Sequence, residues 1–258
     1  MTTLNWDHTV HYVNDLDKVI RTFEEHGLIA FHGGSHTQWG TYNVLSYFGL
    51  NYIEFLGIED IELALSITDP NEVVKDAITS LPDQEVLSRV AISTNDIDAT
   101  VEKLKEHNLK VSPIMQGKRR NAQGQLIEWK MVTIQGDFQG LKYPFIIQWK
   151  GHSDERIESL TASGIIREHP AGKVEVEKAV FYVTNPAAVV EHWRSLLGLT
   201  ENTCDKLPNS IKVDNFFFEF KEGNQNQLNQ LIFSTNSPHL QGKSIKVGGG
   251  EYTFNSST

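Results

Sequence analysis

The fold is decided by one stretch near the start of the chain, Trp6-Asp7-His8-Thr9-Val10-His11-Tyr12-Val13-Asn14-Asp15-Leu16-Asp17. Its first part is rich in β-branched and aromatic residues, which is typical of a strand. Its last part carries side chains that can cap a helix, with carboxylates that the helix dipole favours. Apolar residues then recur at helical spacing until Gly27, a natural helix terminator. β-like runs at 28–32, 43–48 and 51–56 complete a strand, a helix and three strands.

The same pattern occurs again further along the chain. Residues 87–94 predict a strand, and Asn95-Asp96-Ile97-Asp98 repeats the capping sequence before another helix and more strands. A third copy starts at 177–186, and a fourth start at 231–236 is followed by too few residues to complete a unit. We therefore expect an α+β chain of three βαβββ units and a fragment of a fourth.

The stretches between the units suggest how the chain is divided. Residues 58–85 are acidic with helical periodicity, and we interpret them as a solvated connecting helix. Residues 151–172 have little β character and are predicted to be a linker. We expect a first domain at 1–150 and a third, degenerate unit with a fragment at 173–258. An incomplete last half would expose apolar residues such as those at 216–218, which favours a homodimer or cover by the chain's own tail.

Composition excludes several classes of protein. Hydrophobic residues make up 39% of the chain and charged residues 22%, which is sufficient for a globular core. A net charge of −10 argues against nucleic-acid binding, and no apolar run is long enough to span a membrane. The N-terminus lacks the features of a secretion signal, and a single cysteine, Cys204, fits a reducing compartment. We expect a cytoplasmic protein without nucleic-acid or membrane partners.

The repeated unit resembles the building block of the vicinal oxygen chelate superfamily, which includes glyoxalase I, extradiol dioxygenases and antibiotic-resistance proteins. Residues 5–150 resemble glyoxalase-like domain proteins more narrowly. The fragments that carry this resemblance are Asp7-His8, Asn14-Asp15-Leu16, Gly33-Gly34-Ser35-His36, Gly40-Thr41-Tyr42-Asn43, Tyr52-Ile53-Glu54-Phe55 and Pro144-Phe145-Ile146-Ile147-Gln148-Trp149. The resemblance implies paired βαβββ modules that form an open, cupped mixed sheet around a pocket.

The resemblance also implies where a metal would bind, on the first and last strands of the paired units. The matching positions are His8 and Glu54 in the first unit, with Arg89 and Gln148 in the second. Imidazole and carboxylate suit Zn, Ni, Mn or Fe, and Gln148 could add a weaker amide oxygen. Arg89 has no lone pair to give, so we expect it to pair with Glu54 or to bind an anionic substrate. The alternative is that His8 and Glu54 form only hydrogen bonds inside the cup.

The third unit offers no complete metal set. Ala179 stands at the position that matches His8, whereas Glu219 matches Glu54. Gln230 occupies the matching position in the fourth fragment, which has no terminal strand for a second ligand. We therefore expect residues 173–258 to support the fold or an interface.

Two further stretches supply candidate substrate-binding residues. The glycine-rich loop 33–41 lacks the ending of a phosphate-binding loop, so we expect His36, Thr41 and Asn43 to line the cup, with His36 and Glu54 as catalytic groups. An exposed β-turn is the alternative. The basic cluster 117–124 precedes Trp129, and relatives have a comparable Arg and Trp beside the pocket. Arg120 and Trp129 are therefore candidates to bind an anionic substrate, unless the cluster is a solvated loop.

Several functions are compatible with these residues. One is a glyoxalase-like lyase, isomerase or dioxygenase that acts on a small, oxygen-rich, anionic metabolite with the help of a divalent metal. A second is a non-catalytic protein that binds or sequesters such a molecule through a degenerate metal site. A third is a structural or regulatory protein whose half-module pairs with another chain. The sequence indicates neither a Ser-His-Asp nor a Cys-His catalytic arrangement. The acidic neighbours of Cys204 would raise the pKa of its thiol and so would not activate it.

Overall fold

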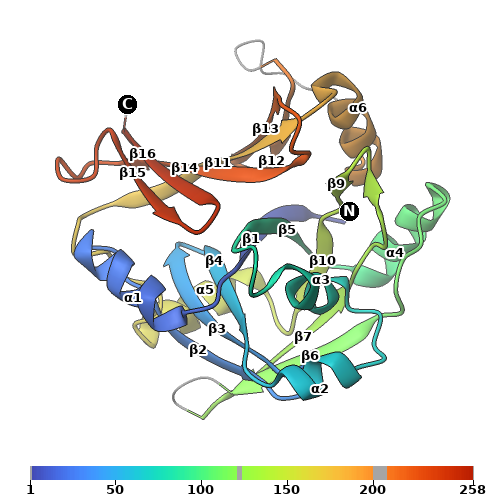
Figure 1. Cartoon of the computed structure of the whole chain (residues 1–258), viewed down its shortest axis with the longest axis horizontal. Coiled ribbons are helices and arrows are strands. Elements are labelled where there is room, and N and C mark those ends of the chain that lie inside the picture. The colour runs from blue at the N-terminus through green and yellow to red at the C-terminus, as the bar shows by residue number, and fades with distance from the viewer. Residues whose placement is uncertain (1, 121–123, 200–207, 258) are drawn as a thin grey trace.

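The computed structural model describes residues 2–120, 124–199 and 208–257, within which strands form two large sheets and one short hairpin (Figure 1). The first sheet has the order β2-β3-β4-β1-β5-β10-β7-β6. In chain order its strands are β1 (Leu4–Tyr12), β2 (Phe31–His36), β3 (Thr41–Phe48), β4 (Asn51–Ile58), β5 (Leu87–Thr94), β6 (Met115–Arg120), β7 (Leu126–Val132) and β10 (Phe145–Trp149). The hairpin consists of β8 (Asp137–Phe138) and β9 (Leu141–Lys142).

The first sheet contains two units of the same design. β1 pairs in parallel with β4, β5 pairs in parallel with β10, and β1 and β5 meet antiparallel at the centre. Helix α1 (Leu16–Glu25) follows β1, and α4 (Ile97–Glu106) follows β5. The caps form as predicted, because Asp15 accepts a hydrogen bond from the Lys18 amide at 2.8 Å and Asp96 accepts one from the Ala99 amide at 3.0 Å. The predicted α+β class with paired units around a cupped mixed sheet is confirmed.

The second sheet repeats this arrangement, with the order β12-β13-β11-β14-β16-β15. Helix α6 (Pro186–Leu197) follows its first strand, and the second half of the sheet replaces the helix by a turn. The fourth unit therefore does have a terminal strand, paired in parallel with its first strand, and the expectation that it lacks one was wrong. The strands are β11 (Val174–Val183), β12 (Ser210–Val213), β13 (Phe216–Glu222), β14 (Gln227–Thr235), β15 (Lys243–Val247) and β16 (Gly250–Ser256).

Strand register corrects the predicted match between the first and third units. Val10 pairs with Glu54, and Val180 pairs with Glu219. The residue two positions before each valine is His8 in the first unit and Lys178, not Ala179, in the third. The Lys178 ammonium lies 2.9 Å from the Glu219 carboxylate. An ion pair therefore stands where the first unit has an imidazole and a carboxylate.

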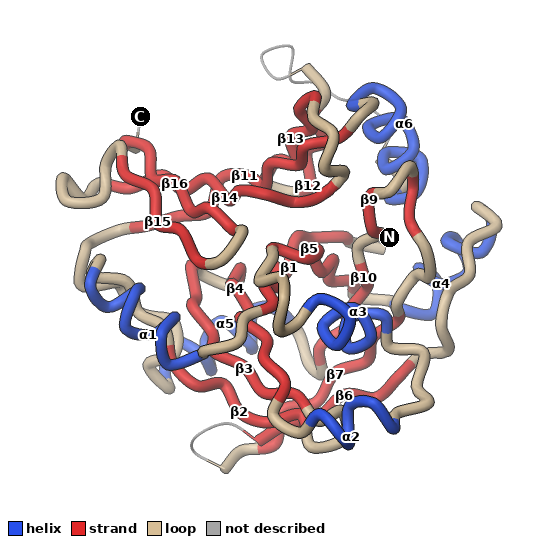
Figure 2. The backbone as a smooth tube through the Cα atoms, viewed as in Figure 1, coloured by secondary structure: helices blue, strands red, loops and turns tan. Residues whose placement is uncertain are grey.

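The second sheet packs on the outer face of the first, so both share one hydrophobic core (Figures 1 and 2). Trp6 of the first sheet meets Phe218 of the second edge-to-face, with ring centroids 5.3 Å apart. The side chain of Phe218 is fully buried. The apolar surface that motivated the prediction of a homodimer is thus largely covered by the chain's own first sheet, and the homodimer stays a prediction.

The inner side of the cup is partly filled by the segment that follows the first unit. This segment forms α2 (Ile61–Ser66) and α3 (Glu72–Ser80), and Val73, Val74 and Ala77 of α3 are buried against the sheet. The interpretation of residues 58–85 as a solvated connecting helix was therefore wrong. Its apolar residues form a stripe that packs in one cluster with Val10, and Asp76 of the same helix pairs with the buried Arg89.

Candidate functional site

The remaining part of the cup contains a pocket with an empty volume of about 510 Å³, part of it open to solvent. Its walls are mostly aromatic and aliphatic, and its polar groups include His8 of β1 and Glu54 of β4. Helix α3 closes one side of it with Val73 and Val74. Other lining residues are His8, His36, Trp39, Thr41, Asn43, Leu45, Tyr52, Glu54, Leu56, Asn71, Arg119, Trp129, Met131, Phe145, Ile147 and Trp149.

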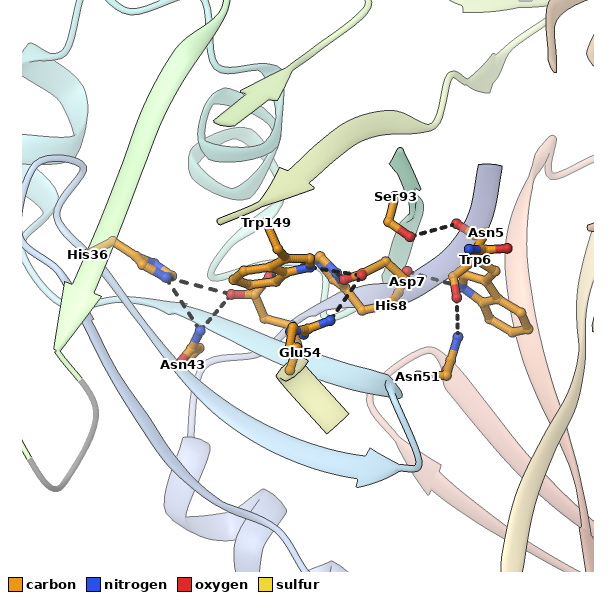
Figure 3. Close-up of polar contacts among 11 residues, drawn as sticks. Asn5, Trp6, Asp7, His8, His36, Asn43, Asn51, Glu54, Ser93 and Trp149 are labelled. Atoms are coloured by element: carbon orange, nitrogen blue, oxygen red, sulfur yellow. Dashed lines mark hydrogen bonds and ion pairs between the residues drawn. The ribbon is translucent and has the colours of Figure 1, made fainter. Parts of the chain in front are cut away.

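A chain of charged side chains crosses the floor of the pocket (Figure 3). His8 Nδ1 lies 2.7 Å from Asp7 Oδ1, and His8 Nε2 lies 3.5 Å from Glu54 Oε2. Asp7 also accepts a hydrogen bond from Trp149 Nε1 at 2.9 Å. The imidazole stacks on the ring of Tyr52 with centroids 4.5 Å apart, which fixes its plane. His8 is thus held between two carboxylates.

The charges of this chain follow from burial and from the neighbours of each group. Burial by itself would lower the pKa of His8, but the bonds to Asp7 and Glu54 outweigh it and raise the pKa above its usual value. Burial opposes ionisation of Glu54, yet His8, His36 and Asn43 together lower its pKa to about 2. Burial lowers the pKa of His36 to about 4. At neutral pH the pocket therefore holds a carboxylate at Glu54 and a neutral imidazole at His36.

Neighbouring strands add the polar residues predicted from the glycine-rich loop. His36 Nδ1 lies 3.0 Å from Thr41 Oγ1, and His36 Nε2 lies 3.8 Å from Glu54 Oε1. Asn43 donates from Nδ2 to Glu54 Oε1 at 2.6 Å (Figure 3). These three residues, like His8 and Trp129, line the same pocket as Glu54. The structure therefore brings six of the predicted site residues together.

Gln148 is not among them. Its Oε1 accepts a hydrogen bond from the Ile97 amide at 2.9 Å, and its Nε2 donates to the Asn95 carbonyl at 3.1 Å, so it secures the start of α4. Strand register explains the error: β10 pairs Phe145 with Ala91, just as β4 pairs Glu54 with Val10. The position that corresponds to Glu54 in the second unit is thus Phe145, whose ring meets His8 edge-on with centroids 5.4 Å apart.

Arg89 also lies outside the pocket lining, so the expected ion pair with Glu54 does not form. Its side chain is 3% exposed and pairs with Asp76 on α3, whose carboxylate also lies 3.1 Å from Lys142 Nζ. Arg89 corresponds to His8 in the repeat, but α3 covers this end of the cup. The packed helix therefore separates Arg89 from Glu54.

The basic cluster contributes a different arginine from the one predicted. Arg120 is exposed and donates to the Gly124 carbonyl at 2.8 Å, whereas Arg119 is 8% exposed and lines the pocket. Side chains alternate along β6, so neighbouring residues face opposite sides of the sheet. Arg119 donates a hydrogen bond to the Gly33 carbonyl at the pocket wall. Alternation with the buried Met115 and Gly117 could have indicated Arg119 from the sequence.

Two residues that orient and neutralise the His8 site, Asp7 and Arg156, were not predicted from the sequence. Asp7 was visible beside His8 but was not assigned a role. Arg156 lies on α5 (Ser153–Ala162), within the predicted linker, and nothing in its local sequence pointed to the site. Its guanidinium lies 3.5 Å from Asp7 Oδ2 and 4.1 Å from the centre of the Trp149 ring. A cation and an indole thus neutralise and orient Asp7.

Comparison with known proteins places this geometry in a family. The sequence pattern of the glyoxalase-like domain matches residues 6–197, which is most of the chain. The chain belongs to the glyoxalase-like domain family. The predicted resemblance is thereby confirmed. The match includes both units that form the pocket and continues through α6.

Solved structures resemble this chain to different extents. A hypothetical protein from Staphylococcus aureus is 22% identical, with a TM-score of 0.82 over 98% of this chain and 100% of that chain. A methylmalonyl-CoA epimerase from Mycobacterium tuberculosis is 15% identical, with a TM-score of 0.40, and the match covers 59% of this chain and 91% of that one. No curated protein matches the chain.

The residues of this glyoxalase-like site do not fit a divalent metal. Of the four positions that the family resemblance implies, two hold His8 and Glu54, but the others hold Arg89 and Phe145, which cannot ligate. Both nitrogens of His8 already face carboxylates. Across the described residues, no group of three or more His, Cys, Asp or Glu side chains is arranged to hold a metal ion. Cys204 lies outside those residues, as do positions 121–123 of the basic cluster.

Within the described parts of the chain, no helix is both long and apolar enough to cross a bilayer. The longest, α6, has 12 residues, fewer than the roughly 20 that a spanning helix needs.

Proposed function

We propose that this protein binds a small, oxygen-bearing organic molecule in the pocket and exchanges a proton with it. The observation that carries the proposal is the Asp7–His8–Glu54 chain, which places an acid and a carboxylate 3.5 Å apart on the floor of an aromatic pocket. Pockets of this kind, apolar with a few converging polar groups and shifted pKa values, are typical binding or active sites.

The walls favour a flat ligand. The Trp129 ring centroid lies 6.4 Å from that of Trp39 and 5.7 Å from that of Trp149, so indoles surround the space above the floor. Aromatic rings of this kind contact flat or unsaturated groups over a large area. Arg119 adds one guanidinium to the lining. It takes the role first assigned to Arg120, and it would favour a ligand with a carboxylate or another anionic group.

The proposed chemistry is enolisation of a carbonyl compound. The Glu54 carboxylate removes a proton from the carbon beside the carbonyl, and the His8 imidazolium gives a proton to the carbonyl oxygen, so the product is the neutral enol. The proton on Glu54 then passes across the 3.5 Å contact to His8, which restores both groups. Asp7 keeps the imidazole oriented throughout. No step uses a metal.

A non-catalytic binding protein is the second candidate, and the pKa of Glu54 favours it. A carboxylate whose pKa lies at about 2 is a weak base, since it holds an abstracted proton poorly. A protein that only sequesters its ligand would still use the aromatic walls and Arg119. The two candidates differ in whether the enol forms.

Phenylpyruvate tests the proposal because it combines an aromatic ring, a carboxylate and an enolisable carbon. Binding is measured by quenching of tryptophan fluorescence, and enolisation by the ultraviolet absorbance of the enol. We expect wild type to bind and to accelerate tautomerisation. The Glu54→Gln variant should still bind but lose the acceleration by about 100-fold or more. Binding with no acceleration by wild type would assign the non-catalytic role. If benzoate, phenylacetone and phenylpyruvate all leave the tryptophan signal unchanged, the proposed function is wrong.

A further inference from the structure

A second cavity lies beside α5, with an empty volume of about 1100 Å³ that includes space open to solvent. It lies between α5, the β6–β7 hairpin and the end of β10. Its lining mixes hydroxyl, amide and charged groups with a few aliphatic ones. The residues are Tyr47, Arg119, Gln125, Leu126, Ile127, Glu128, Trp149, Lys150, Gly151, His152, Glu155, Arg156, Ser159, Leu160, Ser163 and Ile165.

This α5 cavity adjoins the aromatic pocket. Arg119 and Trp149 line both spaces, so they form a common wall between them. Arg156 connects them chemically as well, because it lines the cavity while its guanidinium lies 3.5 Å from Asp7 beneath the pocket. Only side chains such as Arg119 and Trp149 therefore separate a molecule bound in the pocket from the α5 cavity.

The way α5 packs keeps this space open. A surface helix usually buries an apolar stripe against the body of the protein. All ten residues of α5 are described, and none of them is buried. Leu160 packs only partly against the aromatic cluster around Tyr47 and Tyr52. Helix α5 therefore makes little apolar contact with the body of the protein, and the cavity lies beside it.

Arg119 indicates the charge of an occupant. The other cations of the cavity have partners: Lys150 lies 2.6 Å from Glu128, and Arg156 pairs with Asp7. Arg119 is 8% exposed, and among the described residues no carboxylate lies within ion-pair distance of it. Arg119 instead donates a hydrogen bond to the carbonyl of Gly33, which carries no charge. A guanidinium removed from water in this way is stabilised strongly by an anionic partner.

We propose that the ligand has two parts, and that the α5 cavity binds a polar, anionic tail. A flat, oxygen-bearing head lies in the aromatic pocket, the chain of the ligand passes Trp149, and a carboxylate or phosphate on the tail pairs with Arg119. This inference rests on the proposed function, since it extends the ligand of the same pocket. It names the substrate class as an elongated organic anion rather than a compact one.

Three probes of graded length and charge test the inference by tryptophan fluorescence. Benzamide represents the head alone, N-benzoylglycylglycine adds a polar tail with a carboxylate, and N-benzoylglycylglycinamide has the same tail without the charge. We expect N-benzoylglycylglycine to bind about tenfold more tightly than its amide, which is the effect of one charge-assisted hydrogen bond. Equal binding of the acid and the amide would overturn the anionic tail.

A pair of variants on α5 tests the location. Ser159→Trp fills the cavity from an exposed position, and Glu158→Trp is the matched control on the same helix, at a residue outside the cavity lining. Ser159→Trp should weaken binding of N-benzoylglycylglycine by about tenfold or more and leave binding of benzamide unaffected, while the control changes neither. If both probes bind the Ser159→Trp variant as they bind wild type, the tail does not lie in this cavity. If no probe binds wild type, the proposed function fails first, and that result differs from loss of the tail effect alone.

Discussion

His8 illustrates how one side chain acquires its properties from its contacts. Between Asp7 and Glu54 the imidazole is stabilised as a cation, although it is buried. Each carboxylate is stabilised in turn, by Arg156 and Trp149 at Asp7 and by Asn43 at Glu54. Removal of any member changes the charge balance of the rest, because the groups are close and screened little by water.

The first prediction concerns this balance. Glu54→Gln removes one of the two carboxylates that raise the pKa of His8, so we expect the pKa of His8 to fall. An NMR titration of the imidazole signals measures the shift. Glu62→Gln, at an exposed position on α2, is the control and should leave the His8 signal unchanged. A His8 pKa equal to that of wild type would show that the contact with Glu54 contributes no charge stabilisation.

Helix α3 shows how an inserted element can redefine a site. The repeat of the two units alone would leave both ends of the cup open, with Arg89 and His8 in related positions. The insertion covers one end, and Asp76 neutralises the arginine that the cup would otherwise expose. The remaining pocket belongs mainly to the first unit and to the facing strands of the second.

The second prediction tests the ion pair under α3. Asp76→Asn leaves the buried Arg89 without its carboxylate, which costs roughly 3 kcal/mol of unfolding free energy for a pair of this kind. The double variant Asp76→Leu with Arg89→Met replaces both charges by apolar groups and should lose much less. Urea unfolding measures both. The idea fails if the single variant is as stable as wild type.

The whole molecule depends on contact between its two sheets. Their facing sides share one core, in which Trp6, Phe23 and Phe55 of the first half meet Phe218 and Tyr252 of the second. His11 lies at this junction, with Nδ1 hydrogen-bonded to the Tyr252 hydroxyl. Burial lowers the pKa of His11 to about 3, so it is neutral in the folded protein.

The third prediction follows from His11. Its pKa is about 6.5 when the chain is unfolded and about 3 when folded, so the unfolded state binds more protons between these values. The contribution of His11 to stability should be complete above about pH 6.5 and fall as the pH drops toward 3, by about 2 kcal/mol between pH 6.5 and pH 5. His11→Asn removes this contribution, so the melting temperature of the variant should depend less on pH over that range. An unchanged pH dependence would contradict the role of His11.

The fourth prediction concerns the division at residues 151–172. We propose that the parts before and after it do not fold independently, because a fragment of residues 1–172 would expose Trp6 and Phe55 to water. The fragment should bind a hydrophobic dye and unfold without a cooperative transition. A sharp thermal transition of the fragment in calorimetry would instead favour a separate first domain.

Local patterns in the sequence determined the parts of this protein that depend on near neighbours. Asp15 and Asp96 cap helices because each bonds to an amide three residues on, so the repeat of strand and helix could be predicted. His8 and Glu54 were predicted from the family resemblance, which implies ligand positions on the first and last strands of a unit. The local sequence left His36 and Asn43 between a pocket role and an exposed β-turn, and the family resemblance favoured the pocket.

Only the tertiary structure decided the features that depend on distant pairing. The register of β10 against β5 places Phe145, and not the predicted Gln148, at the position that corresponds to Glu54. This long-range pairing is not specified by periodicity within β10. Arg89 is separated from the pocket because α3 packs into the cup, and Arg156 joins the site from a helix with no buried face. Composition limits which contacts are favourable, but three-dimensional packing selects among them, because burial and charge depend on neighbours far away in the chain.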